Sequence, residues 1–320
     1  MKLTIAYYLY QDCDNLEKSL ESLFSQQHKL LEIIFISDFM TQEVEDILSK
    51  FDLTTANIKI VKFQETLGVS YACNFAMKLA KGEYIYFAEQ KVIFKPKFFI
   101  NFLKWISSEK KYDFITFDKK TSIILKDNKN ITEWKKSNLD TKTNLSFIVN
   151  SKLSVKYRIF NLKFLKDMNI KFVCYKNFHS LFIFDVIENS ENWLISNDFL
   201  IDWYEPKSKS FDYSLYDILN SSDVLHSKLD KLNITAEKKE AYEMWIVILV
   251  LYEFLKKMFS LYKNEKKILL KCLNNADTLI NSLCPNYKQN KCLNLLINIK
   301  LLNYIKNFKP TVEYVKNFLF

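Results

Sequence analysis

The stretch GEYIYFAEQKVIF, residues 82–94, decides the fold class of this chain of 320 residues. Aromatic and β-branched residues over 83–88 are typical of a buried strand. The strand ends abruptly on the polar triplet Glu89, Gln90 and Lys91, after which the chain becomes apolar again. Because open α/β sheets bind their ligands at the carboxyl ends of the strands, the triplet indicates a ligand site or the remnant of one.

Strands and amphipathic helices alternate on the amino-terminal side of this stretch. The patterns predict strands at 3–10, 31–38, 57–63 and 83–88, with helices between them at 15–26, 41–51 and 68–81. Thr41 is the expected N-cap of the second helix. This alternation predicts an α/β fold with a mainly parallel, Rossmann-like sheet flanked by helices, in which Asp38 and Glu89 lie at the carboxyl edge.

The remainder of the chain is mixed and then helical. We expect a helix at 95–109, a strand at 112–118, a loop or edge hairpin over 119–144, a short helix leading into a strand within 161–172, and two strands within 193–204. From Thr235 the pattern is helical almost to the end, which predicts an α/β domain over 1–205 and an all-α region over 206–320. The apolar run 244–252 is far shorter than the roughly 20 residues of a membrane-spanning helix, so it predicts a buried core helix or an interfacial helix.

Composition narrows the classes of partner. The six cysteines form no Cys-x-x-Cys pair, so neither a zinc site nor a disulfide framework is indicated, and we expect a cytoplasmic protein. The first residues read as a strand, not as a signal peptide. The net charge is +9, but Arg158 is the single arginine, so nucleic acid is not an expected partner. From Pro206 onward there are 18 basic and 11 acidic residues, which fits either a solvated lysine-rich face or attachment to an anionic membrane surface.

The order of these motifs resembles family 2 glycosyltransferases of the GT-A fold. The resemblance covers roughly residues 1–205, and it is also close to the lipid-sugar transferases of wall-less, AT-rich bacteria. It rests on IIFISD (33–38) and on LGVSYACNFAMKLAKGEYIYF (67–87), with Pro96 a few residues beyond. The positions that match the family pattern are Gly68, Ala72, Asn74, Ala80, Gly82, Tyr84 and Phe87. The resemblance implies sugar transfer from a nucleotide sugar, with UDP expected as the nucleotide, to a lipid or glycan acceptor.

The triplet occupies the Asp-x-Asp position of that family, where two carboxylates meet the ribose and a divalent cation that bridges the diphosphate. Glu89 keeps the first charge, but Lys91 places an ammonium where the second metal ligand belongs. Hard cations such as Mg²⁺ or Mn²⁺ need anionic oxygen ligands. The resemblance therefore implies that the usual metal site is lost and that no cofactor is expected, with Lys91 itself holding the diphosphate. A metal-dependent variant stays open as the alternative, in which the family alignment is displaced by a residue or two.

The resemblance also assigns the remaining candidate residues. Asp38 would contact the base, and Asn74 lies in the nucleotide-binding motif. From the residues themselves, Tyr7, Tyr8 and Tyr10 of the first strand either pack in the core or place one ring at the carboxyl edge to stack on a base, and we expect Tyr10 in that role. His179, beside Phe178, lies where the family has its catalytic base, with Asp185 the nearest carboxylate. We therefore expect His179 and Lys91 as catalytic residues, and Asp38, Glu89, Asn74 and Tyr10 as nucleotide-binding residues.

Several departures from the family pattern leave a second hypothesis open. Cys73 replaces an arginine of the nucleotide-binding motif, and Glu205 stands where an arginine near the diphosphate is typical. As an alternative to binding the base, Asp38 serves as a strand-end cap. As an alternative to ligand contacts, Glu89 and Lys91 form a solvated ion pair with each other. The alternative to an active enzyme is thus a catalytically degenerate glycosyltransferase, retained as a binding or scaffold protein. Whether the chain is an enzyme stays undecided by the sequence.

Overall fold

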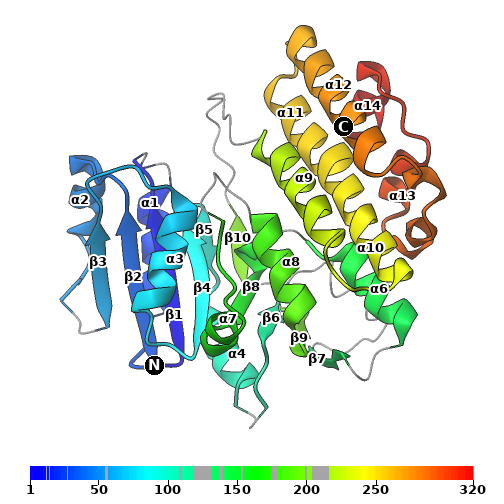
Figure 1. Cartoon of the computed structure of the whole chain (residues 1–320). Coiled ribbons are helices and arrows are strands. Elements are labelled where there is room, and N and C mark those ends of the chain that lie inside the picture. Colours follow the sequence, from blue (N-terminus) through cyan, green and yellow to red (C-terminus); the bar gives the residue numbers. More distant parts are fainter. Residues whose placement is uncertain are drawn as a thin grey trace. The chain divides into compact units, whose positions relative to one another are not determined.

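A computed structural model describes residues 1–11, 13, 15–26, 28–54, 57–107, 110–117, 131–136, 140–152, 154–173, 179–198, 200–203 and 216–319. The chain forms two compact units, one of Met1–Asn138 with Ser154–Ser208 and one of Leu139–Leu153 with Lys209–Phe320 (Figure 1). The helix α6 (Thr141–Asn150) therefore belongs to the second unit, although it precedes strands of the first in sequence. The division at 205/206 that the sequence suggests stays a prediction, since residues 204–215 lie outside the described ranges.

The first unit is built on an eight-stranded mixed sheet with the order β3-β2-β1-β4-β8-β6-β9-β7. The strands are β1 (Leu3–Leu9), β2 (Leu31–Ser37), β3 (Ile58–Lys62), β4 (Tyr84–Glu89), β6 (Phe114–Thr116), β7 (Ile131–Lys135), β8 (Arg158–Asn161) and β9 (Asn192–Ser196). The four strands β3, β2, β1 and β4 pair in parallel, whereas β8 is antiparallel to both β4 and β6. A separate two-stranded sheet pairs β5 (Val92–Phe94) with β10 (Ile201–Trp203). The predicted mainly parallel sheet is confirmed.

Helices cover both faces of this sheet (Figure 1). One face carries an apolar cluster that includes side chains of α1 (Leu16–Phe24), α2 (Gln42–Leu48) and α4 (Phe98–Trp105). On the other face lie α3 (Val69–Leu79) and α8 (His179–Asn189), where Phe87 of β4 meets Phe160 and Phe182. Thr41 caps α2 as predicted, because its side chain accepts the N–H of Val44. Alternate residues of each central strand therefore serve two different interfaces.

One sequence-based expectation for the first unit was wrong. The strand β8 precedes the short helix α7 (Leu162–Asp167), and no strand follows it at 168–172. The physical reason lies at Phe172, whose backbone N–H and C=O both bond to the side-chain amide of Asn74, at 2.9 and 2.7 Å. A side chain thus replaces the ladder hydrogen bonds that a strand would have needed.

The second unit is helical and includes the apolar run of the sequence. Its elements are α6, α9 (Asp217–Leu229), α10 (Ala236–Val247), a π-helical segment (Ile248–Phe254), α11 (Leu255–Leu261), α12 (Lys266–Leu283), α13 (Ile299–Lys306) and α14 (Val312–Leu319), with 3₁₀ turns at Tyr287–Gln289 and Lys291–Leu295. Residues 244–251 are all buried, which confirms the predicted core helix. Tyr304 donates its hydroxyl to the carbonyl of Leu251 within the π-helical segment, at 2.7 Å. Nowhere in the described ranges is a helix both long enough and apolar enough to cross a membrane.

A buried carboxylate joins the amino ends of the central strands. Glu32 of β2 is 2% exposed and accepts the Thr4 hydroxyl at 2.6 Å, the Lys59 ammonium at 2.7 Å and the Lys81 N–H at 2.8 Å. Burial by itself would raise the pKa of Glu32, but these donors outweigh burial and the pKa is lowered. At the same place Gly82 donates its N–H to Thr4, and a Cβ at Gly82 would come within 2.6 Å of the Thr4 nitrogen. This close approach explains why glycine stands there.

Replacing the buried carboxylate should therefore weaken the sheet. We expect Glu32→Gln to lose about 1–3 kcal/mol of unfolding free energy at pH 7, because the Lys59 ammonium loses its charged partner and the amide offers one acceptor oxygen in place of two. Since the folded-state pKa is depressed, the stabilisation is present above the unfolded value near 4.3 and is lost as pH falls through the folded pKa. Urea unfolding at several pH values should show the two proteins converging below about pH 4. Glu45→Gln, which removes the exposed partner of Lys62, is the matched control with a much smaller effect. Equal losses in both variants would contradict this account of Glu32.

Candidate functional site

The carboxyl edge of the sheet brings together the polar strand ends identified in the sequence. In the parallel register Tyr8 of β1 lies opposite Glu89 of β4, and Leu9 lies opposite Ser37, the residue before Asp38. Asp38 and Glu89 therefore flank the end of β1 from two sides. Both residues lie at the carboxyl edge of the parallel strands, as the sequence predicts.

Two tyrosines of β1 each hold one of these carboxylates. The Tyr8 hydroxyl donates to Asp38 Oδ2 at 2.9 Å, and the Tyr10 hydroxyl donates to Glu89 Oε2. The two rings meet edge to face with centroids 4.8 Å apart. Burial, followed by the nearby carboxylates, raises the pKa of both phenols, so each remains a hydrogen-bond donor at neutral pH.

Asp38 also caps the segment that begins α3. Its Oδ2 accepts the N–H of Gly68 at 2.6 Å, and Gly68 has a φ of +83°, a conformation that favours glycine. The side chain is buried, at 4% exposure, and its Oδ1 has no hydrogen-bond partner among the described residues. Asp38 thus makes the contacts of a cap and keeps one buried acceptor atom in addition. Buried acceptors of this kind normally have a partner.

The triplet that ends β4 is held by contacts with Tyr10. Gln90 is fully buried, and its Oε1 accepts the Tyr10 N–H at 3.1 Å. The Lys91 ammonium lies 5.3 Å from the centroid of the Tyr10 ring, within the range of a cation–π interaction. No ion pair joins Glu89 to Lys91 in the described part of the chain. The triplet therefore places a carboxylate at the hydroxyl of Tyr10 and an ammonium near the ring of the same tyrosine.

Asn74 and His179 meet at a third residue, Phe172. Asn74 of α3 clamps the main chain of Phe172, and the Phe172 ring contacts the His179 ring with centroids 5.8 Å apart. His179 is the first residue of α8. The structure thus groups Tyr10, Asp38, Glu89 and Lys91, and separately links Asn74 to His179 through Phe172.

Of the four other positions that the family resemblance singles out, two lie among the described residues. Cys73 of α3, where the family resemblance expects an arginine, is buried, and burial together with the Glu89 carboxylate raises the pKa of its thiol. It is therefore a neutral neighbour of the carboxylate. Asp185 lies half-buried on α8. Phe178 and Glu205 lie outside the described residues.

Sequence reasoning missed two residues of this edge. The sequence predicts only core packing or base stacking for Tyr8, and it marks Gln90 only as the middle residue of the polar triplet 89–91. The period of two along β1 carries the signal for Tyr8, because it places Tyr8 on the same face as Tyr10 and opposite to Tyr7. Gln90 gave no comparable signal, since its contact depends on how the turn after β4 meets β1.

Known proteins identify the family of this chain. The profile described as "Glycosyl transferase family 2" matches residues 5–168, just over half of the chain. The chain therefore belongs to glycosyltransferase family 2, and it has the GT-A fold.

Two curated relatives match over shorter stretches. The putative teichuronic acid biosynthesis glycosyltransferase TuaG of Bacillus subtilis (strain 168) is 30% identical over 80 residues, which are 25% of this chain and 32% of the relative. The UDP-Glc:alpha-D-GlcNAc-diphosphoundecaprenol beta-1,3-glucosyltransferase WfaP of Escherichia coli is 33% identical over 87 residues, which are 27% of this chain and 34% of the relative. The matches thus span about a third of each relative's length.

Solved structures extend the similarity of the fold to the whole chain. S. aureus TarS 1–349 in complex with UDP-GlcNAc superposes with a TM-score of 0.66 at 16% identity, covering 100% of this chain and 90% of that one. The mannosyltransferase PcManGT from Pyrobaculum calidifontis, in complex with GDP-Man and Mn²⁺, gives 0.56 at 11% identity, covering 99% and 85%. Identities this low establish the fold and leave substrate and chemistry to be argued from the site.

The clamp made by Asn74 generates a test of its role. We expect Asn74→Ala to lose about 1–3 kcal/mol of unfolding free energy, because the Phe172 N–H and C=O lose their partner. Urea unfolding measures this loss, with Lys78→Ala on the exposed side of the same helix as the control. A stable Asn74→Ala protein that had lost only nucleotide binding would instead make Asn74 a direct ligand.

Proposed function

We propose that this protein transfers a sugar from a UDP-linked nucleotide sugar to a lipid or glycan acceptor. The observation that carries the proposal is the position of Asp38 and Glu89, which flank the end of β1 at the carboxyl edge of the sheet. This edge lies within the region that matches the family. The names of the relatives support a UDP-sugar donor and a polymer or lipid-linked acceptor, since WfaP uses UDP-Glc with a diphosphoundecaprenol acceptor and TarS was solved with UDP-GlcNAc.

In the proposed donor site, different residues of this edge bind different parts of the nucleotide. Asp38 accepts a hydrogen bond from the base through its unsatisfied Oδ1, Tyr10 stacks on the base, and Glu89 accepts from the ribose hydroxyls. The nucleotide-binding role of Asn74 is indirect in this proposal, because both ends of its amide are already bonded to Phe172. Asn74 would hold the wall of the site in place.

Lys91 supplies the positive charge that the diphosphate leaving group needs. The ammonium lies beside Tyr10, one residue beyond Gln90, where the family pattern has its second metal-binding carboxylate. Charge that is already positioned before reaction can stabilise the developing negative charge of a leaving group as a metal ion does. A divalent cation is therefore not needed in this proposal.

His179 acts as the general base. The acceptor hydroxyl attacks the anomeric carbon as the bond from that carbon to the diphosphate oxygen breaks, and His179 takes the hydroxyl proton. Attack opposite the leaving group inverts the configuration at that carbon. Histidine suits this task because its ordinary pKa lies near neutrality.

A second candidate function is a catalytically degenerate transferase that serves as a binding or scaffold protein. The observations that favour it are the contacts of Asp38 as a cap for Gly68, the thiol of Cys73 in place of an arginine, and the ammonium of Lys91 in place of a metal ligand. Loss of ligand binding would leave such a fold intact, since none of these changes disturbs the apolar cores.

Ligand protection separates the two functions. A nucleotide sugar that binds only the folded state stabilises it by about 2.7 kcal/mol at 100 times its dissociation constant, so a UDP-sugar should raise the melting temperature. The rise should be the same with EDTA as with Mn²⁺. The absence of any shift with a panel of nucleotide sugars, with or without Mn²⁺, would favour the scaffold.

Changing the sign of the charge at residue 91 tests the metal-free mechanism. We expect Lys91→Asp to make UDP-sugar binding dependent on Mn²⁺, because it restores a second carboxylate near Glu89. Isothermal titration with EDTA or Mn²⁺ measures the change, and Lys104→Asp on the exposed side of α4 is the control that should behave as the unmodified protein. Strong Mn²⁺ dependence in the unmodified protein would sink the role given to Lys91.

We further propose that this protein is cytoplasmic and that its C-terminal helices hold it at the inner face of the membrane. This position would bring it to a lipid acceptor. The apolar run Met244–Tyr252 does not supply an anchor, because residues 244–251 are buried in the second unit. Exposed lysines of the same unit remain as the attracting charges, namely Lys256, Lys257, Lys263, Lys266, Lys267 and Lys271. A lysine near an anionic leaflet contributes about 1 kcal/mol.

Co-sedimentation with vesicles tests this attachment. We expect salt-sensitive binding to anionic vesicles and none to neutral ones, because the attraction is electrostatic and screened by salt. Lys263→Gln/Lys266→Gln/Lys267→Gln should weaken it, whereas Lys29→Gln/Lys78→Gln/Lys104→Gln, with the same change of charge in the first unit, should not. Failure to sediment with either vesicle at low salt would remove the membrane from the proposal.

A further inference from the structure

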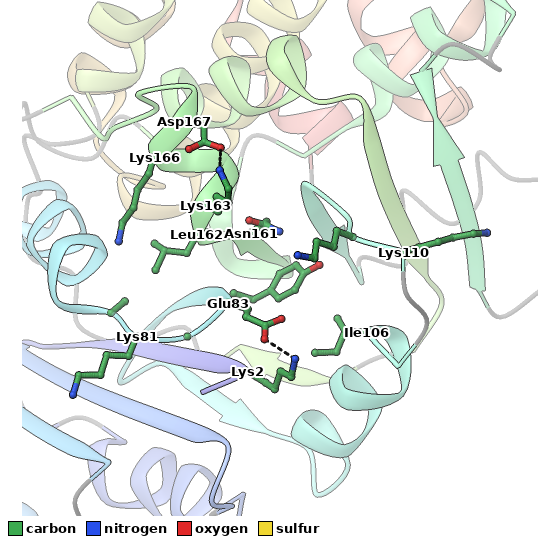
Figure 2. Close-up of a pocket in the computed structure, with 14 residues that line it drawn as sticks. Lys2, Lys81, Glu83, Ile106, Lys110, Asn161, Leu162, Lys163, Lys166 and Asp167 are labelled. Atoms are coloured by element: carbon green, nitrogen blue, oxygen red, sulfur yellow. Dashed lines mark hydrogen bonds and ion pairs between the residues drawn. The ribbon is translucent and has the colours of Figure 1, made fainter.

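A cavity lies at the amino edge of the sheet, away from the strand ends that carry Asp38 and Glu89 (Figure 2). Its wall includes Lys2 before β1, Glu83 before β4 and Asn161 at the end of β8. Because β8 is antiparallel to β4, Asn161 lies opposite Tyr84 and its strand ends at this same edge. The cavity measures about 520 Å³, and all its lining residues belong to the first unit.

Lysines from four separate segments surround the cavity. They are Lys2, Lys81, Lys110, Lys111, Lys163 and Lys166. Figure 2 shows Lys166 on α7 and Lys81 in the segment before β4 on two different walls. The small residues Ala80 and Gly82 contribute to the same lining. Segments distant in sequence thus bring cations to one concave surface.

Two carboxylates share this cavity, and each is already paired. Glu83 accepts the Lys2 ammonium at 2.5 Å and Asp167 accepts that of Lys163 at 2.5 Å, as the dashed lines in Figure 2 mark. Beyond these two pairs, Lys81, Lys111 and Lys166 contribute three further positive charges to the lining of this cavity. Like charges within a Debye length of about 8 Å repel one another, and a bound anion would relieve that repulsion.

We propose that this cavity binds a phosphate-bearing anion that carries at least two negative charges. Ammonium groups are donors without acceptors, which suits phosphate oxygens, and their flexible stems can close around the ligand. The concave shape fits a compact anion, either a free phosphate compound or the headgroup of an anionic lipid. The proposal does not rest on the transferase activity, because its residues lie at the other edge of the sheet.

Binding of pyrophosphate to the full chain tests the site. We expect Lys81→Gln/Lys111→Gln/Lys166→Gln to weaken pyrophosphate binding by at least about tenfold, since several ammonium–phosphate contacts of modest individual strength are lost together. Glu83→Gln should strengthen binding, because it removes a carboxylate and releases Lys2. Isothermal titration at two salt concentrations gives the affinities, and thermal unfolding without ligand checks that each variant folds.

Two controls separate this cavity from other cations of the chain. Lys29→Gln/Lys78→Gln/Lys104→Gln removes the same number of charges from other parts of the first unit, and Lys256→Gln/Lys257→Gln/Lys271→Gln removes them from the second unit. Both should keep their affinity within about twofold if the cavity is the binding site. Equal weakening in all three variants, or no pyrophosphate binding and no anionic-vesicle binding by the unmodified protein, would overturn the proposal.

Vesicles distinguish the two sources of phosphate. If the ligand is a lipid headgroup, the cavity variant should sediment less with phosphatidylglycerol vesicles than Lys29→Gln/Lys78→Gln/Lys104→Gln does. Phosphatidylcholine vesicles should then not sediment the unmodified protein. If the ligand is a free phosphate compound, the variant should lose pyrophosphate binding and sediment with phosphatidylglycerol as the unmodified protein does. Loss of neither binding in the cavity variant would show that the lysines serve only as surface charge.

Discussion

The parallel pairing of β1 between β2 and β4 is the constraint on which the rest of the first unit depends. It requires the backbone before β4 to approach β1 closely, which Gly82 allows because a Cβ there would collide with Thr4. The buried carboxylate of Glu32 fixes the same region by binding Thr4, Lys59 and the Lys81 N–H. With the amino ends of these strands held in this way, the parallel register of β2 and β4 with β1 places Asp38 and Glu89 at the carboxyl edge of the sheet.

The framework of the carboxyl edge is made by hydrogen bonds in which Lys91 takes no part. Tyr8 and Tyr10 position the two carboxylates, and these hydrogen bonds do not depend on a metal ion. An ammonium at Lys91 is compatible with that framework, because it lies against the Tyr10 ring and not against Glu89. Family membership and fold are therefore consistent with both an active enzyme and a degenerate one, and ligand binding is the property that separates them.

The helical unit shows the same separation between scaffold and surface. Its apolar run is buried in the core, where the Leu251 carbonyl of the π-helical segment accepts a hydrogen bond from the Tyr304 hydroxyl. Its surface includes many exposed lysines. In the first unit lysines also gather, around the cavity at the amino edge. A chain with a single arginine thus uses ammonium groups wherever it needs positive charge.

By itself the sequence determined the strands and helices up to β4, the shared edge of Asp38 and Glu89, and the burial of 244–251, because hydrophobic periodicity follows directly from which side of an element faces the core. It failed at 168–172, since the Asn74 side chain replaces a strand partner there, and a contact 98 residues apart leaves no local pattern. For the same reason only the tertiary structure revealed the hydrogen bonds of Tyr8 and Gln90, the meeting of Asn74 and His179 at Phe172, and the lysines of the cavity at the amino edge. Periodicity records the environment of one residue, whereas a site depends on which distant segments the fold brings together.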